Sequence, residues 1–205
     1  MGRLNWQRPR RVYTAWYDDP EARLAETAPR LAEKTKRRIG RPSNRPPQPL
    51  LNIDQAAAEL LDVRSCVVHT DGACEPNPGR GGWGVSIEAN GQTLVELCGG
   101  DPSTTNNRME MTAAIVALTV LPLACQVTLL SDSQYVINGM TIWSAGRKRK
   151  MRNGKKPVPN VDLWRTLDAL ADGRSITWRW VKGHNGHRGN ERADHLASLA
   201  IRQSV

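Results

Sequence analysis

The chain has 205 residues, 39% of them hydrophobic and none phenylalanine, and its 29 lysines and arginines against 20 acids give a net charge of +9. This length suits one domain of roughly 140 residues plus an extension. No apolar stretch is long enough to span a membrane, the amino terminus lacks the apolar core of an export signal, and the four cysteines lack metal-ligand spacing, so we expect a soluble, cytoplasmic protein with reduced thiols.

Residues 1–63 are predicted to form a basic, proline-rich extension that precedes a domain over residues 64–205. The extension holds 12 basic and 8 acidic residues and seven of the chain's thirteen prolines. Its pattern favours an interrupted helix over residues 20–38, a linker over residues 41–49 and a short helix over residues 54–62. Two interpretations stay open: the extension binds nucleic acid through its tryptophans and tyrosines, or it is a disordered or protein-docking tail.

The rest of the chain shows strand and helix patterns in turn, which indicates an α/β domain with a mixed five-stranded sheet and helices on both faces. The first three strands form a meander in which Asn90–Gly91 is a tight turn, and Asp172–Gly173 ends the penultimate helix. The strands are expected at residues 66–70, 82–88, 93–98, 127–131 and 176–181. The helices are expected at residues 105–121, from 133, at 161–171 and from 193.

Two acidic residues stand where predicted buried strands end. Asp71 follows the apolar run at residues 66–69 and precedes Gly72, which allows the backbone to turn. Asp132 follows the strand at residues 127–131. Parallel strands that end in aspartate place both side chains on one rim of the sheet, where open α/β folds bind their ligands. We therefore expect the two carboxylates to lie close together.

Glu110 is the only charged residue between Arg108 and Asp132, inside a helix that is apolar around its circumference. Such a helix is buried, and burying an unpaired carboxylate costs several kcal/mol. A metal ion shared with the two strand-end aspartates would pair it, since Mg²⁺ prefers oxygen ligands. The alternative is that Glu110 caps the helix, with Asn106 or Asn107 nearby as an N-terminal signal.

A glycine-rich loop over residues 181–194 carries two histidines and ends at a fourth acid, Asp194. Histidine takes and releases a proton near neutral pH, so His184 is a candidate for proton transfer beside the carboxylates. A solvated loop without function is the alternative, but the acid at its end favours the functional interpretation. We assign no catalytic role to the second histidine, His187.

These residues carry a resemblance that covers residues 65–200: the segment is similar to a type 1 ribonuclease H of the bacterial type. The resemblance implies the ribonuclease H-like fold with a basic protrusion. It also implies hydrolysis of the RNA strand of RNA·DNA hybrids, leaving 5′-phosphate and 3′-hydroxyl ends. The alternatives are a hybrid-binding protein without turnover and a domain derived from a retroelement. The matching blocks are Thr70–Cys74, Asn77–Gly79, Gly81–Gly84, Thr104–Glu110, Ser131–Val136, Asn160–Trp164 and Val181–Asp194.

The resemblance implies a role for each acid. Asp71, Glu110, Asp132 and Asp194 would ligate two Mg²⁺ ions, with Mn²⁺ as a substitute, and His184 would be the loop histidine of the mechanism. In a two-metal site one ion activates the attacking water and the other stabilises the leaving 3′ oxygen. We expect the enzyme to act as a monomer on the hybrid.

Selection for a hybrid requires contacts to the sugars of the RNA strand. The resemblance implies that main-chain groups from Gly72 to Cys74 test for the ribose 2′-hydroxyl, which is both a donor and an acceptor. The side chains of Asn106, Glu110 and Gln134 are implied to share this role. Base edges need not be contacted, so cleavage should be largely independent of sequence.

The DNA strand is expected to bind through a phosphate. The resemblance implies that Asn77, Thr105 and Asn106 contact this phosphate, with Asn107 beside them in the same block. Simpler structural roles stay open for these residues, and both kinds of role are compatible. A turn would explain the sequence at Asn77–Gly79, and a helix cap would explain Asn106 and Asn107.

Residues 147–156 hold seven basic residues and no acid, whereas the rest of residues 64–205 has 10 basic residues against 12 acids. An isolated basic run is often only a solvated face. Its position matches the family's basic protrusion, which binds the hybrid backbone in a salt-dependent way. Arginine and lysine here replace tryptophans that bacterial members often carry in this element. The expected substrate contacts are Trp143, Arg147, Lys148, Arg149 and Lys150.

Overall fold

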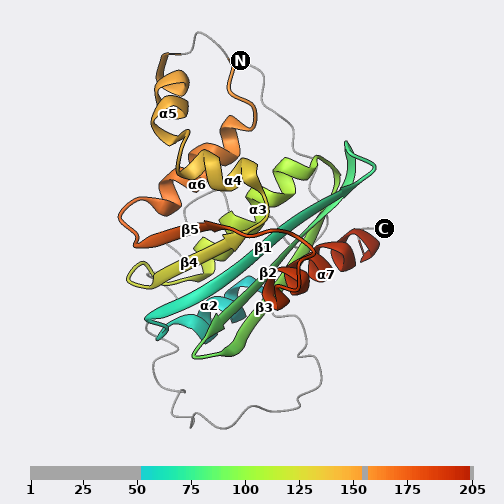
Figure 1. Cartoon of the computed structure of the whole chain (residues 1–205), viewed down its shortest axis with the longest axis vertical. Coiled ribbons are helices and arrows are strands. Elements are labelled where there is room, and N and C mark those ends of the chain that lie inside the picture. The colour runs from blue at the N-terminus through green and yellow to red at the C-terminus, as the bar shows by residue number, and fades with distance from the viewer. Residues whose placement is uncertain (1–51, 154–156, 204–205) are drawn as a thin grey trace. The chain divides into compact units, whose positions relative to one another are not determined.

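The structure is a computed structural model, and it describes residues 52–153 and 157–203 (Figure 1). Five strands form one sheet in the order β3-β2-β1-β4-β5. The strands are β1 (Ser65–Glu75), β2 (Gly79–Ala89), β3 (Gln92–Thr104), β4 (Gln126–Ser131) and β5 (Ile176–Trp180). The helices are α2 (Ile53–Leu60), α3 (Asn106–Val120), α4 (Gln134–Met140), α5 (Ser144–Asn153), α6 (Val161–Ala171) and α7 (Arg188–Gln203).

The sheet is mixed, as the sequence predicts. β1, β2 and β3 pair in antiparallel fashion, whereas β4 and β5 add in parallel on the other side of β1. Asn90 and Gly91 connect β2 to β3 with φ angles of 53° and 73°. This left-handed conformation is the one that asparagine and glycine tolerate best in a two-residue hairpin turn. The predicted meander and its turn are therefore confirmed.

Helices cover both faces of the sheet (Figure 1). α3 approaches β1 so closely that a Cβ atom on Gly72 would clash with the main-chain nitrogen of Glu110. α7 approaches β2 in the same way, because a Cβ atom on Gly84 would clash with the main-chain oxygen of Ala193. Only glycine permits these two approaches. They bring an acid-bearing helix to each face of the central strands.

α2 is the one described part of the predicted extension. It begins with a capping box in which Asn52 and Gln55 each accept a hydrogen bond from the other's main chain. Ala56 and Leu60 are completely buried, and the helix packs against β3 and α3. The predicted short helix is confirmed over most of its length. The other predictions for the extension lie outside the described residues.

β1 is longer than the sequence predicts, which changes the position of Asp71. The strand was expected to end at residue 70, but it continues to Glu75 because these residues stay paired with β2. Asp71 therefore lies inside a strand and not at its end. The expected rim still exists, because β4 ends at Ser131, which pairs with Thr70. Asp71 is the first residue of β1 beyond the parallel ladder.

The predicted basic protrusion is the helix α5, which stands away from the sheet beside α4 and α6 (Figure 1). Its sequence, SAGRKRKMRN, contains five of the seven basic residues in the run. None of the helices within residues 52–153 and 157–203 is long and apolar enough to cross a membrane.

Candidate active site

Three of the predicted acids meet at the rim where β4 ends. Asp71, Glu110 and Asp132 each offer a carboxylate oxygen, and these oxygens lie within 4.8 Å of one another. The pairing of β1 with β4 sets Asp71 beside Asp132, because each residue directly follows the last paired positions of the two strands. Glu110 joins them from the first turns of α3, where the missing side chain of Gly72 lets the helix approach.

Burial and mutual repulsion dominate the electrostatics of this cluster. Burial, and then the nearby Asp132, raises the pKa of Asp71 from 3.8 to about 8. Burial, and then Asp71, raises the pKa of Glu110 well above its usual range. Oε2 of Glu110 is buried and has no hydrogen-bond partner among the described residues.

This arrangement fits a divalent cation. Two buried carboxylates, Asp71 and Glu110, and the half-buried carboxylate of Asp132 lie close enough to repel one another and need a positive charge, and the unpartnered oxygen of Glu110 is free to coordinate one. All three donors are oxygens, the ligand type that Mg²⁺ and Mn²⁺ prefer. The alternative role for Glu110 as a helix cap receives no support, because Glu110 is the fifth residue of α3 and its Oε2 makes no hydrogen bond with a described residue.

Asp132 contacts three residues that were not among the predicted site residues. The indole Nε1 of Trp180 donates to the main-chain oxygen of Asp132 at 3.0 Å. The amide Nδ2 of Asn190 donates to its Oδ2 at 3.4 Å. Gly183 lies against the same oxygen, and a Cβ atom there would clash with it. The only signal for Trp180 was its register with Ser131, which needs the strand pairing to be known.

Asp194 and His184 lie at the outer edge of the cluster. Asp194, on α7, is close enough to Asp71 to contribute to the raised pKa of Asp71, but it is not one of the three acids that converge. Nδ1 of His184 lies 3.9 Å from Oδ2 of Asp194. The histidine side chain is 81% exposed, so it can exchange protons with solvent at the rim. His187 instead packs on the buried His69, with ring centroids 5.2 Å apart.

The residues expected to contact the DNA strand are brought together at the start of α3. Oδ1 of Asn77 accepts a hydrogen bond from the main-chain nitrogen of Asn106 at 3.2 Å. Asn77 thus supplies a side-chain partner that Thr105 does not provide. Asn106, Asn107 and Asn77 are all exposed, so their remaining polar groups are open to a ligand.

The residues expected to test the RNA strand lie on both sides of the acids. Gly72 is buried at the point where α3 touches β1, and Cys74 is half-buried, with Sγ 3.2 Å from the main-chain oxygen of Pro76. Gln134 is exposed at the start of α4, which Ser133 caps. The structure therefore places exposed or main-chain polar groups around the cluster.

The basic helix α5 divides into exposed and buried residues. Lys148, Arg149 and Lys150 are exposed, and Trp143, just before the helix, is 46% exposed. Arg147 is different, because its side chain is buried and pairs with Asp168. The expectation that Arg147 binds a phosphate is therefore corrected: its guanidinium group is already used inside the protein.

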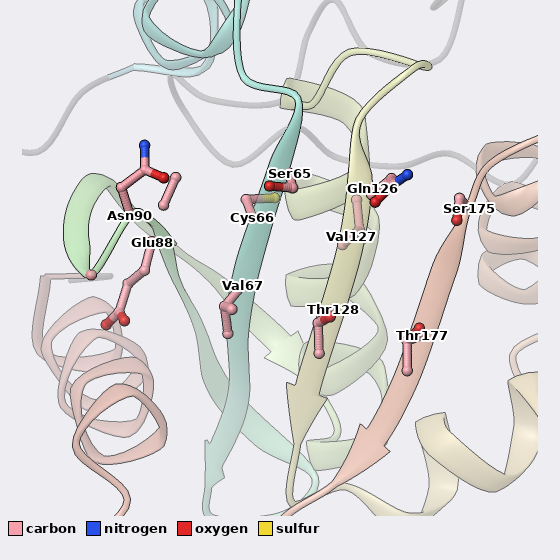
Figure 2. A pocket seen from close by; sticks show the side chains of 12 residues that line it. Ser65, Cys66, Val67, Glu88, Asn90, Gln126, Val127, Thr128, Ser175 and Thr177 are labelled. Atoms are coloured by element: carbon pink, nitrogen blue, oxygen red, sulfur yellow. The ribbon is translucent and has the colours of Figure 1, made fainter.

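A pocket at the other end of the sheet lacks this chemistry. It lies over the first residues of β1, β4 and β5, and Ser65, Val67, Thr128 and Thr177 are among its lining residues (Figure 2). Among the described residues that line it, Glu88 alone is charged. Since no second acid faces Glu88 there, this pocket offers no site comparable to the carboxylate cluster.

Comparisons with known proteins agree with this geometry. The model of the RNase H family matches residues 63–202. The ribonuclease H of Polaromonas sp. (strain JS666) is 56% identical over 143 residues, which cover 68% of this chain and 89% of that protein. The ribonuclease H of Alcanivorax borkumensis is 53% identical over 141 residues, which cover 68% of this chain and 93% of that protein.

Solved structures show the same fold. LC9-RNase H1, described as a type 1 RNase H with the type 2 active-site motif, has a TM-score of 0.59 and 29% identity, covering 70% of this chain and 74% of that chain. LC11-RNase H1 in complex with an RNA/DNA hybrid has a TM-score of 0.54 and 25% identity, covering 68% of this chain and 98% of that chain. The family match, the close relatives and the fold lead to one conclusion: this chain belongs to the ribonuclease H family, as a type 1 member.

Proposed function

We propose that this protein is an endoribonuclease that hydrolyses the RNA strand of RNA·DNA hybrids and leaves 5′-phosphate and 3′-hydroxyl ends. The observation that carries the proposal is the convergence of Asp71, Glu110 and Asp132. Membership of the ribonuclease H family supports the reaction, and the hybrid bound to the related LC11-RNase H1 supports the substrate. A hybrid-binding protein without turnover would have no need for three clustered acids, two of them buried, that repel one another.

The acids of the cluster would hold the metal. Asp71, Glu110 and Asp132 are the inner ligands in this proposal, and Asp194 serves at the edge. Mg²⁺ is the proposed ion, with Mn²⁺ as a substitute, because the donors are oxygens. When bound, a pair of such ions supplies an activated water and charge stabilisation at the leaving oxygen.

The chain's own residues orient the substrate and move protons. Asn77 and Asn106 are proposed to bind a phosphate of the DNA strand, and Gln134 to contact the RNA strand; their exposure supports this. His184 is proposed to exchange a proton with solvent or with the product, which its exposed position next to Asp194 supports. One chain supplies the whole acidic cluster, and this supports action as a monomer. The free cysteines support a cytoplasmic location.

The decisive experiment compares the wild type with Asp132→Asn on a labelled RNA·DNA hybrid in Mg²⁺. We expect the variant to lose cleavage by more than roughly 10³-fold, about 4 kcal/mol of transition-state stabilisation, while it still binds the hybrid. Asp172→Asn is the matched control, because Asp172 is an exposed acid at the C-cap of α6. This variant should cleave the hybrid as fast as the wild type. Wild-type cleavage by Asp132→Asn would refute the site.

The substrate panel tests the reaction class. RNA·DNA, RNA·RNA and DNA·DNA duplexes are incubated with the wild type in Mg²⁺ or Mn²⁺, and product ends are identified by ligation. We expect cleavage of the hybrid alone, with ligatable 5′-phosphate ends. Binding of the hybrid without any cleavage in either metal would favour the non-catalytic alternative.

A further inference from the structure

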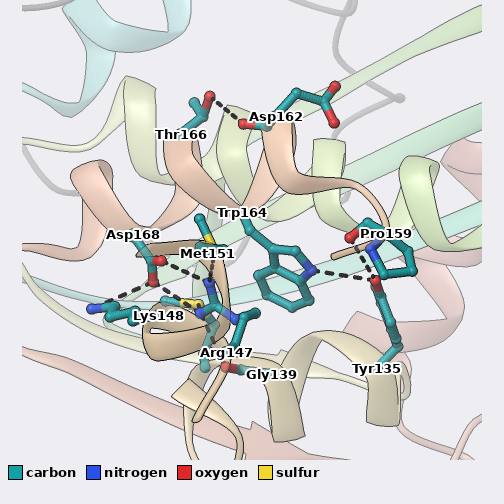
Figure 3. Close-up of polar contacts among 11 residues, drawn as sticks. Tyr135, Gly139, Arg147, Lys148, Met151, Pro159, Asp162, Trp164, Thr166 and Asp168 are labelled. Atoms are coloured by element: carbon teal, nitrogen blue, oxygen red, sulfur yellow. Dashed lines mark hydrogen bonds and ion pairs between the residues drawn. The ribbon is translucent and has the colours of Figure 1, made fainter. Parts of the chain in front are cut away.

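Arg147 is the buried exception on an exposed basic helix. Nη1 and Nη2 of Arg147 donate to the two carboxylate oxygens of Asp168 at 2.7 and 2.9 Å, a paired geometry that joins α5 to α6. Nη2 also donates to the main-chain oxygen of Gly139 at 3.1 Å, which joins α5 to α4. Figure 3 shows the guanidinium group at the point where the three helices meet.

The guanidinium group of Arg147 also stacks on the ring of Trp164. The Arg147 Cζ atom lies 4.1 Å from the centroid of the Trp164 ring, a cation–π distance. The indole is itself fixed, because its Nε1 donates to Tyr135 Oη at 3.3 Å, and Gly139 lies so close to the ring that a Cβ atom there would clash (Figure 3). The edge of the guanidinium group is thus bound by the carboxylate of Asp168, and its face packs on the ring of Trp164.

α5 has few other means of attachment. Its sequence, SAGRKRKMRN, offers only Ala145 and Met151 as apolar side chains, so hydrophobic burial contributes little to its position. Met151 is half-buried, and its Sδ lies 3.8 Å from Nη1 of Arg147. The polar contact of Arg147 therefore replaces the apolar contact that usually holds a helix on its neighbours.

We propose that the Arg147–Asp168 pair is a positioning device for the hybrid. By fixing α5 on α6, it sets the direction in which Lys148, Arg149 and Lys150 present their charges to the phosphate backbone. Arg147 and Asp168 are positioning residues, since their side chains are only 6% and 14% exposed and pair with each other. This inference rests on the proposed function, because it needs α5 to be the surface that binds the hybrid.

Asp168→Asn provides a test in which charge and position predict opposite results. The substitution removes a negative charge, so simple electrostatics predicts tighter binding of the polyanionic hybrid. Loss of the two parallel hydrogen bonds between Arg147 and Asp168 instead loosens α5 from α6. We therefore expect KM to rise about 5- to 30-fold, the range for losing a charge-assisted pair. Turnover at saturating hybrid should stay within about twofold, since the acids are untouched. Asp172→Asn is the control, because it removes the same charge from the C-cap of the same helix, outside the contact.

Arg147→Lys separates the effect of the paired hydrogen bonds from the effect of the positive charge. Lysine keeps the positive charge but cannot donate two parallel hydrogen bonds or stack flat on Trp164. The contact of Lys148 Nζ with Asp168, at 3.5 Å, is left in place. We expect a rise in KM similar to that of Asp168→Asn, with unchanged turnover, and a shallower dependence of log Kd on log salt because fewer phosphates are neutralised.

The outcomes separate cleanly. The inference is overturned if Asp168→Asn binds the hybrid as tightly as Asp172→Asn, or if Arg147→Lys keeps the wild-type KM and salt slope. A fall in turnover together with a lower melting temperature, at unchanged KM, also overturns it, because that pattern indicates a purely structural contact. If the wild type neither binds nor cleaves the hybrid, the proposed function itself fails, and that result is visible before any variant is measured.

Discussion

At the scale of the single residue, Asp71 destabilises the fold when no cation is bound. Burial beside Asp132 raises its pKa from 3.8 to about 8. Between these two values the folded state holds more protons than the unfolded state. The free energy of unfolding of the metal-free protein should therefore fall as the pH rises from about 4 to about 8. A divalent cation would favour the ionised form and oppose this loss.

Asp71→Asn should stabilise the metal-free protein. In chelator at pH 8, we expect a free energy of unfolding about 1–3 kcal/mol above that of the wild type, because an amide cannot ionise in the buried cluster. The gain should shrink toward pH 4, where the wild-type carboxyl group is increasingly protonated in both states. Urea unfolding followed by circular dichroism at pH 4, 6 and 8 measures the difference. A less stable variant at pH 8 would contradict the electrostatic account of the site.

Trp180→Phe tests whether the main chain of Asp132 needs its hydrogen bond. The indole donates to the Asp132 oxygen at 3.0 Å just where the β4–β5 ladder ends. We expect kcat to fall about 2- to 10-fold, the equivalent of about 0.5–1.5 kcal/mol for one hydrogen bond, with little change in stability because the indole is half-exposed. Steady-state kinetics on the hybrid provide the measurement, with Trp178→Phe on the same strand as control. An unchanged kcat would show that water replaces the indole.

At the scale of the element, local patterns predicted what depends on local sequence. The turn at Asn90–Gly91 and the buried helix around Glu110 follow from residue type and spacing, and both are confirmed. The prediction that β1 ends just before Asp71 was wrong, because continued pairing with β2 extends the strand to Glu75. Arg147 could not be distinguished from Lys148, since its burial depends on Asp168, 21 residues later in the chain.

Gly84→Ala should show that α7 reaches the site only because β2 has no side chain there. The added methyl group would meet the main chain of α7 at Ala193, next to Asp194. We expect a loss of about 1–3 kcal/mol in stability from this overpacking, and lower kcat because Asp194 moves with the helix. Thermal unfolding and hybrid cleavage measure the two effects.

Gly146→Ala is the matched control for this glycine. Nothing lies within 4 Å of a Cβ atom at Gly146, which is inside α5. Alanine should therefore leave stability unchanged or raise it by up to about 1 kcal/mol, through its higher helix propensity. Equal melting temperatures for Gly84→Ala and the wild type would show that the contact between β2 and α7 is looser than the structure indicates.

At the scale of the whole molecule, the acids proposed for cleavage and the basic residues proposed to bind the hybrid lie on different elements. The acids gather where β1 and β4 part, and the positive charge gathers on α5, which is joined to the rest of the domain through α4 and α6. Cleavage and binding of the hybrid can therefore be altered independently. This is why we expect Asp132→Asn to lose cleavage and Asp168→Asn to raise KM. The overall fold was predictable because its strand and helix patterns are regular, whereas the attachment of α5 was not, because it depends on contacts of Arg147 with residues from α4 and α6.

The boundary of the catalytic domain provides the last prediction. The family match begins at residue 63 and the sequence predicted a domain from residue 64, but Leu60 and Ala56 of α2 are completely buried against β3 and α3. We therefore propose that the domain includes α2 and its cap, Asn52. A chain that starts at Gln48 should keep the stability of the full chain, whereas one that starts at Val63 should lose about 2–5 kcal/mol, as for removal of large buried side chains. Urea unfolding of the two chains decides the matter: equal midpoints would return the boundary to residue 63, and a lower midpoint for the shorter chain would make α2 part of the enzyme's core.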